Sequence, residues 1–162
     1  YNTEHKFWDL FRPITNCRTG NQNPDHSNTK GNKFQKLTCV WKCVDDLNII
    51  YDNCISPIDH SPSPDGIIYQ TKGKLYDHIN RYWILNCKNE HDKNFDFLIF
   101  YCASKEGKYI ERIYIIPKEK IIKRKTITIY KKPSKGKSWY EEYRFKDLDE
   151  LKKVNDIWKK IL

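Results

Sequence analysis

The chain has 162 residues, enough for one domain with a real hydrophobic core, and its 30 basic and 21 acidic residues give a formal net charge of +9. This excess of positive charge slightly favours nucleic acid as a partner, although a Lys-rich and Asn-rich composition also arises in AT-rich genomes without any function. No apolar run approaches the roughly 18 residues of a membrane span and no signal-peptide pattern opens the sequence, so we expect a soluble, intracellular (cytoplasmic) protein rather than a membrane protein.

The first 28 residues are predicted to stand apart from the rest of the chain. Residues 3–11 have the pattern of a short helix that stops before Pro13, and residues 16–28 are rich in Asn, Gly and Pro, which predicts an irregular loop. Residues 29–162 are expected to form the main part of a single compact domain. The absence of Met suggests that the sequence is a fragment of a longer chain.

Residues 29–46 are predicted to form an amphipathic helix, because their apolar side chains recur at helical spacing. These positions are Phe34, Leu37, Val40, Trp41 and Val44. Residues 47–55, LNIIYDNCI, read as a strand that leads into a loop rich in Ser and Pro.

Several later segments have the composition of strands. Residues 94–104, NFDFLIFYCAS, form a continuous apolar run that is typical of a central strand buried on both faces, and KEG at 105–107 is expected to turn the chain into its partner strand. After the strand at 47–55, the expected strands are 66–76, 81–86, 94–104, 108–117, 125–130 and 139–145.

The C-terminal segment is predicted to be a helix that begins after Asp147. Asp147 at the N-cap and Glu150 three residues later form a capping box. The apolar stripe of this helix would consist of Leu148, Leu151, Val154, Ile157, Trp158 and Ile161. The order helix, strands, helix predicts an α/β fold with a central mixed sheet flanked by helices.

The six cysteines show no CxxC spacing, and several lie in apolar stretches where a free thiol behaves as a small hydrophobic group. We therefore expect buried thiols rather than disulfides. A zinc site formed by Cys17, His26, Cys39 and Cys43 is the less favoured alternative, because their spacing fits no zinc pattern.

The strand at 66–76 places an amide and an ammonium group on one face. Residues i and i+2 of a strand project to the same side, so Gln70 and Lys72 should point together while Tyr69 and Thr71 point the other way. Asp59, in the loop before the strand, could lie alongside them. Oxygen ligands from Asp59 and Gln70 suit Mg²⁺ or Mn²⁺, and a Lys can orient the attacking water in phosphodiester hydrolysis.

These residues resemble the active-site signature of the PD-(D/E)XK, or restriction-endonuclease-like, nuclease superfamily. Pro57 and Asp59 would stand for its PD element, and Gln70, Thr71 and Lys72 for its (D/E)XK tripeptide in the QXK variant. The resemblance covers about residues 29–130. It implies a restriction-like core and a Mg²⁺-dependent DNA endonuclease of restriction or homing type, with Gln35 at the acidic position of the preceding helix.

Three nearby residues have competing interpretations. Asp65 is a rival to Asp59 as the metal carboxylate, but it lies close to Gln70 for a turn between two strands. His60 could be a base or a DNA contact, although a His in a Ser/Pro loop is more often simply exposed. Asp96 is expected to be structural, at the start of a strand.

Double-stranded DNA is the expected substrate, held mainly through phosphate contacts. Arg112 and Arg124 are the candidates for base-edge contacts, since Arg is bidentate. The other candidate DNA-binding residues are Lys74, Lys125, Lys131 and Lys132. A homodimer is expected, because double-strand cutters with one site per chain usually pair by two-fold symmetry. A non-catalytic nucleic-acid-binding module and a nuclease acting on RNA remain alternatives.

Overall fold

The structure is a computed structural model that describes residues 27–47, 59–132 and 138–162. The predicted helix at 3–11, nearly all of the predicted loop at 16–28 and all but the first residue of the predicted strand at 47–55 lie outside these ranges. Within the described part of the chain, no helix is both long and apolar enough to cross a membrane.

The described elements are five strands, three α-helices and two short 3₁₀-helices, η1 and η2. In chain order they are α2 (Ser27–Lys42), β1 (Tyr69–Leu75), β2 (Tyr82–Asn86), η1 (Lys88–Glu90), β3 (Phe97–Ala103), β4 (Ile110–Pro117), α4 (Lys118–Ile121), β5 (Thr126–Tyr130), η2 (Trp139–Tyr143) and α5 (Leu148–Ile161).

The central sheet has the strand order β1-β3-β4 and is mixed, as predicted. β1 runs parallel to β3, and β4 runs antiparallel to β3. β3 is the middle strand, and six of its seven residues are buried, because its continuous apolar sequence satisfies both faces of the sheet. The turn between β3 and β4 passes through Gly107 at a φ of 74°, a conformation that favours glycine.

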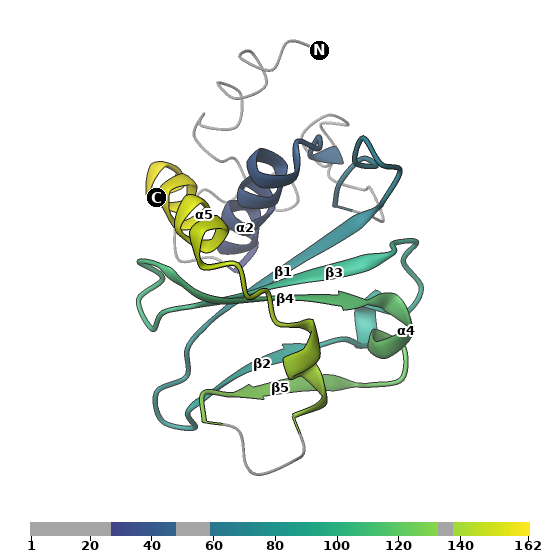
Figure 1. Ribbon diagram of the computed structural model, residues 1–162. Helices are drawn as coiled ribbons and strands as arrows, with labels where there is room; N and C mark the ends of the chain where they lie inside the picture. Colours follow the sequence, from purple (N-terminus) through teal and green to yellow (C-terminus); the bar gives the residue numbers. More distant parts are fainter. Residues whose placement is uncertain (1–26, 48–58, 133–137) are drawn as a thin grey trace.

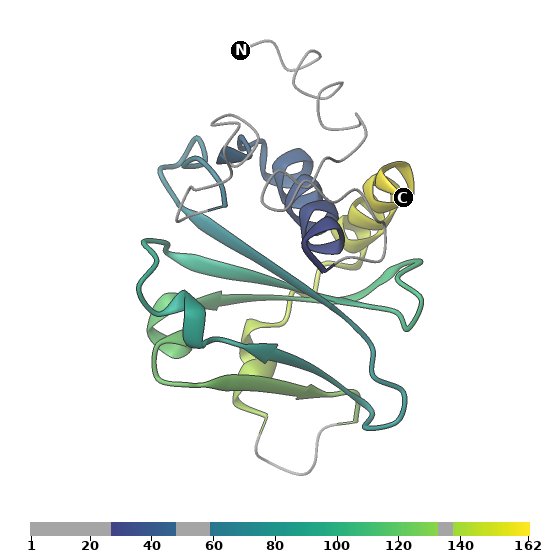
Figure 2. The ribbon, with the colours of Figure 1, turned by 180° about the vertical axis from the view of Figure 1, so that it is seen from behind.

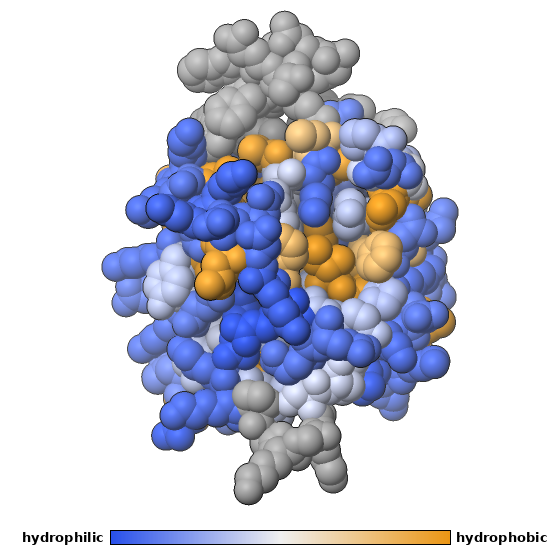
Figure 3. All heavy atoms as spheres, in the orientation of Figure 1, coloured by the Kyte–Doolittle hydropathy of each residue, from blue (hydrophilic) through white to orange (hydrophobic). Residues whose placement is uncertain are grey.

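The two faces of this sheet are covered differently. The helices α2 and α5 lie together on one face, and β2 and β5 form a separate two-stranded antiparallel sheet over the other face (Figures 1 and 2). The predicted mixed sheet with flanking helices is therefore confirmed, with both long helices on the same side. In Figure 3 hydrophilic residues predominate over the lower part of the molecule, where β2, β5 and η2 lie.

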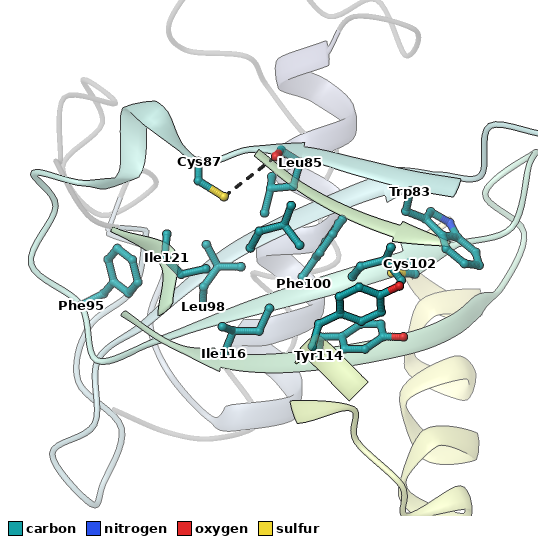
Figure 4. Close-up of a cluster of buried hydrophobic side chains, with 13 residues drawn as sticks. Trp83, Leu85, Cys87, Phe95, Leu98, Phe100, Cys102, Tyr114, Ile116 and Ile121 are labelled. Atoms are coloured by element: carbon teal, nitrogen blue, oxygen red, sulfur yellow. Dashed lines mark hydrogen bonds between the residues drawn. The ribbon is translucent and has the colours of Figure 1, made fainter. Parts of the chain in front are cut away.

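Two hydrophobic clusters hold the layers together. One lies between the central sheet and α2 and α5, and includes Phe34, Tyr101 and Trp158. The other fills the space between the two sheets (Figure 4), where the Trp83 indole also donates a hydrogen bond to Ala103 O at 2.8 Å. Leu98 and Phe100 alternate with residues of the first cluster along β3, so this strand contributes to both.

The ends of the helices follow from their caps. α2 ends at Lys42 rather than at 46, because Cys43 adopts a positive φ of 55° and Val44 N–H donates to Cys39 O at 3.2 Å, the bond that closes a Schellman cap. At the start of α5 the Asp147 side chain accepts from Glu150 N–H, as expected. Leu148 is 76% exposed, so its predicted place in the apolar stripe of α5 is wrong.

The predicted strand at 139–145 is also wrong, because residues 139–143 form the 3₁₀-helix η2. Tyr140 is buried, and Trp139 and Tyr143 pack against the same cluster. Tyr140 and Tyr143 are three residues apart, and Trp139 and Tyr143 are four apart, so a helical turn places all three on one side. In a strand, Tyr140 would point to the face opposite Trp139 and Tyr143. Only Arg144 keeps a strand-like contact, an isolated bridge to Tyr114.

Candidate active site

The two faces of β1 carry different chemistry. Gln70 and Lys72 project toward η1, where Gln70 Nε2 lies 3.2 Å and Lys72 Nζ lies 2.7 Å from the Glu90 carboxylate. Thr71 projects toward α2, and its hydroxyl lies 2.6 Å from that of Thr38. The alternation of a strand therefore separates a charged cluster from a neutral hydrogen-bonded layer.

Asp59 lies directly against β1. Its Oδ2 accepts a hydrogen bond from Thr71 N–H, and its own N–H donates to Gln70 Oε1, both at 3.1 Å. The chain around Asp59 is held by a short antiparallel pairing in which Leu47 N–H donates to Asp59 O at 3.1 Å and Ser61 N–H donates to Asp45 O at 3.0 Å. The structure thus brings Asp59 and Gln70 together.

Glu90, at the end of η1, is the site residue that the sequence did not reveal. It is fully buried, and its second oxygen pairs with Lys93 Nζ at 3.0 Å. It lies in the polar stretch NCKNEHDKN, which has no periodicity and belongs to none of the motifs considered. The one signal in the sequence is its i,i+3 spacing from Lys93, which is too common to indicate a site.

The two carboxylates have opposite pKa shifts. Burial raises the pKa of Asp59, and the nearby charges of Lys72 and Lys93 only partly offset this effect. Burial also acts to raise the pKa of Glu90, but its ion pairs with Lys72 and Lys93 together outweigh burial and lower the pKa. Glu90 is therefore the firmly ionised anchor of the two lysines, and Asp59 is the carboxylate that protonates more readily.

His60 occupies the neutral layer on the other face of β1. It is fully buried, with Nε2 2.7 Å from Thr71 Oγ1 and Nδ1 3.5 Å from Cys39 Sγ. Burial lowers its pKa to about 3, so it is neutral at physiological pH. The expectation that His60 is exposed is wrong, because the loop that carries it folds under α2, and this burial does not suit a DNA contact.

The other predicted carboxylate and amide positions lie elsewhere. Asp65 is exposed in the turn before β1, where Gly66 N–H donates to Ser63 O, so Asp59 rather than Asp65 is the carboxylate beside Gln70.

Gln35 is on α2, which covers the face of the sheet opposite Lys72 (Figure 1). The carboxylate that reaches Gln70 and Lys72 comes instead from η1. Asp96 is structural, since its Oδ2 accepts from Ile68 N–H at 2.8 Å.

The residues expected to bind DNA divide into free and engaged side chains. Lys74, Lys125 and Lys132 are exposed, and Lys131 is exposed but pairs with Glu111 at 3.1 Å. The Arg112 side chain is only 12% exposed, and its guanidinium donates to Lys131 O at 2.6 Å.

Arg124 stacks on the Trp139 ring, with its guanidinium carbon 3.8 Å from the ring centre. The guanidinium groups of both Arg112 and Arg124 are therefore committed to packing within the fold, which does not support their predicted contacts with base edges.

The groups of the candidate site that could bind a metal are the oxygens of Asp59, Glu90 and Gln70. No cluster of three or more His, Cys, Asp or Glu side chains in this part of the chain is placed to hold a metal ion, so the candidate set is two carboxylates and one amide. Cys39, Cys87 and Cys102 are buried free thiols, while Cys43 is exposed. Cys17 and His26 of the alternative zinc set lie outside the described residues.

Comparisons with known proteins identify a similar fold. No family model matches the chain, and no curated protein sequence matches it. Among solved structures, the chain resembles a bacterial homing endonuclease, I-Ssp6803I, with a TM-score of 0.51 and 14% sequence identity. The alignment covers 82% of this chain and 96% of that protein. At this identity the likeness shows a shared fold, a mixed sheet flanked by helices.

Proposed function

We propose that this protein is a metal-dependent DNA endonuclease of the PD-(D/E)XK superfamily, in its QXK form, with Asp59, Gln70, Lys72 and Glu90 in its active site. The observation that carries the proposal is the convergence of these four side chains at β1. The fold shared with a homing endonuclease supports it, because that protein is a nuclease built on a similar mixed sheet.

The donor set fits Mg²⁺ or Mn²⁺. Mg²⁺ is commonly held by one or two carboxylates while it keeps several waters, and Asp59 and Glu90 with the Gln70 carbonyl would provide such a set. Asp59 is buried with a raised pKa, so a nearby cation would favour its ionised form. A bound metal would polarise the phosphate and lower the pKa of a coordinated water.

The side chains of the chain have distinct roles in this proposal. Lys72 is held at the rim of the cluster by Glu90 and is partly exposed, so its ammonium can meet a phosphate oxygen or orient the attacking water. Lys93 pairs with the other oxygen of Glu90 and provides a second positive charge beside the scissile phosphate. Gln70 links the Glu90 carboxylate to the backbone of Asp59, because its amide group donates to Glu90 and its amide oxygen accepts from Asp59 N–H.

We propose double-stranded DNA as the substrate, and a homodimer as the form that cuts both strands. The net charge of +9 and the exposed lysines suit a polyanion, and one site per chain requires two chains for paired cleavage. An intracellular location would follow from this substrate.

The proposal is tested by incubating purified protein with supercoiled plasmid in Mg²⁺, in Mn²⁺ and in EDTA, beside single-stranded and double-stranded RNA. Nicked or linear plasmid with either metal, and intact plasmid in EDTA, is the expected result. The matched control is Asp59→Asn, which keeps the shape of the side chain and removes its charge. Binding without cleavage under every condition would instead identify a nucleic-acid-binding module, and cleavage of RNA alone would identify a ribonuclease.

A further inference from the structure

The two-stranded sheet of β2 and β5 has an outer face that the proposed cleavage chemistry does not use. The strands are antiparallel, with Tyr82 opposite Tyr130, Ile84 opposite Thr128 and Asn86 opposite Thr126. The residues between these pairs point into the core, where Trp83 and Leu85 lie in the cluster between the sheets (Figure 4). The six residues of the outer face are therefore Tyr82, Ile84, Asn86, Thr126, Thr128 and Tyr130.

This outer face is open to solvent. Ile84 is 42% exposed and Tyr130 is 48% exposed, and Asn86 and Thr126 are also exposed. The face carries hydroxyl, amide and methyl groups and no charged side chain. Lys88 N–H donates to Asn86 Oδ1 at 3.0 Å, which holds the Asn86 side chain at the end of β2.

The strands that carry the outer face are flanked by basic residues, of which Lys131 pairs with Glu111 and Arg124 stacks on Trp139. The segments 81–89 and 121–132, which contain the two strands and their flanks, have no Asp or Glu. They carry seven basic residues, which are Arg81, Lys88, Lys123, Arg124, Lys125, Lys131 and Lys132. A neutral, hydrogen-bonding strip between basic flanks is complementary to a groove lined by bases between two phosphate backbones.

We propose that the outer face of β2 and β5 enters the major groove of double-stranded DNA and reads base edges there. The major groove of B-DNA admits a two-stranded β-ribbon, and a five-residue strand spans about 17 Å, roughly one and a half groove widths. Asn86 can pair with adenine, Thr126 and Thr128 can bond to either donors or acceptors, and Ile84 can contact a thymine methyl group. The flanking lysines contact the phosphates on either side.

The ribbon and the proposed active site are continuous. η1, which carries Glu90, follows β2 after Cys87 alone, and Cys87 N–H donates to Lys125 O at 2.9 Å, which extends the pairing toward the site. A duplex held at Lys72 and Glu90 would therefore pass the end of the ribbon at Asn86 and Thr126. This inference rests on the proposed function for the identity of the ligand, but it concerns sequence selection and not cleavage.

The test is selection of bound duplexes from a randomised DNA library, with Ca²⁺ as the divalent cation and intact duplex recovered for sequencing. Wild-type protein is expected to enrich a defined sequence. Asn86→Ala combined with Thr128→Ala should lose enrichment at two or more base positions, with a preference at each reduced about tenfold to a hundredfold. Affinity for unrelated DNA and the salt dependence of that affinity should stay the same.

Two controls separate base reading from other effects. Leu148→Ala removes an exposed apolar side chain from α5, on the opposite side of the molecule, and should leave the selected sequence unchanged. The triple variant Lys123→Ala, Lys125→Ala and Lys132→Ala should weaken binding to every duplex and reduce the salt slope by about three, one for each lysine that no longer reaches a phosphate.

Three outcomes would overturn the inference. They are a wild-type protein that selects no sequence, an outer-face variant that selects the wild-type sequence, and an Ile84→Ala variant that breaks a dimer in sedimentation, since the face would then be a protein interface. This test can fail or succeed separately from the proposed nuclease activity. If the wild-type protein selects a sequence but never cuts DNA, and the outer-face variant loses the selection, base reading by β2 and β5 is supported and only the proposed cleavage is rejected.

Discussion

Lys72 Nζ lies 2.7 Å from Glu90 Oε1, at a boundary where the Lys72 side chain is 35% exposed and Glu90 is fully buried. The pair therefore presents a positive charge to solvent and keeps its negative charge beneath the surface. Under the proposed function, this order of charges would let a phosphate oxygen approach the ammonium group while the carboxylate stays beneath it.

Glu90→Gln should reduce cleavage by at least about 100-fold, because it removes a buried charge that positions two lysines and that would help to hold the metal. DNA binding should be retained, since most of the affinity comes from phosphate contacts spread over the surface. A plasmid cleavage assay beside an equilibrium binding assay separates the two effects. The matched control is Glu106→Gln, in the exposed pair with Lys108 at 3.1 Å, which should cut like the wild type. Equal cleavage by both variants would remove Glu90 from the site.

Asp59→Ala and Lys72→Ala should each abolish cleavage and leave binding largely intact. Under the proposed function, Asp59→Ala should bind DNA at least as tightly as the wild type, since it removes a buried negative charge from the site and no phosphate contact. The control is Lys74→Ala, two residues further along the same strand and exposed, which should retain cleavage and lower the salt slope of binding by about one. Wild-type cleavage rates in both Asp59→Ala and Lys72→Ala would show that the motif assignment is wrong.

Gln70→Glu tests the metal set with a readout that does not depend on activity. The new carboxylate would lie within reach of Glu90, to which the Gln70 amide now donates at 3.2 Å, so like charges would meet where a hydrogen bond exists. We expect a lower melting temperature in EDTA, a larger rise on addition of Mg²⁺ than in the wild type, and cleavage at lower Mg²⁺ concentration, since a carboxylate binds a hard cation better than an amide. Identical Mg²⁺ responses in the two proteins would mean that Gln70 is not near the metal.

Local sequence rules predicted the elements that carry the site, because each has a strong local signal. The alternation of β1 put Gln70 and Lys72 on one face, the apolar run of β3 identified the central strand, and Asp147 marked the start of α5. The position of Asp59 in the loop before β1 and the family resemblance both indicate it as a candidate, and a short antiparallel pairing that leaves no periodic signal in the sequence holds it beside Gln70.

Glu90 and His60 could not be predicted by those rules. Glu90 reaches Gln70 and Lys72 only because β2 and η1 fold beneath β1, a tertiary placement that leaves no period in the sequence. His60 is buried because the polar loop before β1 is covered by α2, which overrides the usual exposure of a Ser- and Pro-rich segment. In both cases the partner group, and not the residue's neighbours in sequence, determines its environment.

The burial of His60 predicts a loss of stability in mild acid. The pKa of His60 is about 3 in the folded state, below its ordinary value of 6.5. As the pH falls from 6.5 toward 3, the His60 side chain therefore takes up a proton in the unfolded chain but not in the folded one. The free energy of unfolding should be unaffected by His60 above pH 6.5 and should fall by about 2 kcal/mol from this group at pH 5. Urea unfolding of His60→Gln at both pH values should show a correspondingly smaller loss.

His78→Gln, at an exposed turn position, serves as the control for a histidine substitution made outside the core. Because other groups titrate in the same window, the difference between each variant and the wild type is the informative quantity. A His60→Gln protein with the full wild-type loss would show that His60 is already charged or exposed in the folded state.

The contact between Gly73 and Phe34 leads to a prediction about stability. A Cβ at Gly73 would overlap the Phe34 ring, which is fixed by stacking on Tyr101 and Trp158 at 5.9 and 4.9 Å between ring centres and so has no room to withdraw. Gly73→Ala should therefore lower the free energy of unfolding by about 1–3 kcal/mol, measured by urea denaturation, because it overpacks the cluster between β1 and α2.

Gly31→Ala is the matched control, since a Cβ there meets no atom within 4 Å and alanine should stabilise α2 by up to about 1 kcal/mol. Phe34→Leu in the Gly73→Ala background should recover part of the loss by making space for the new methyl group, whereas an additive loss from the two substitutions would show that they do not contact each other.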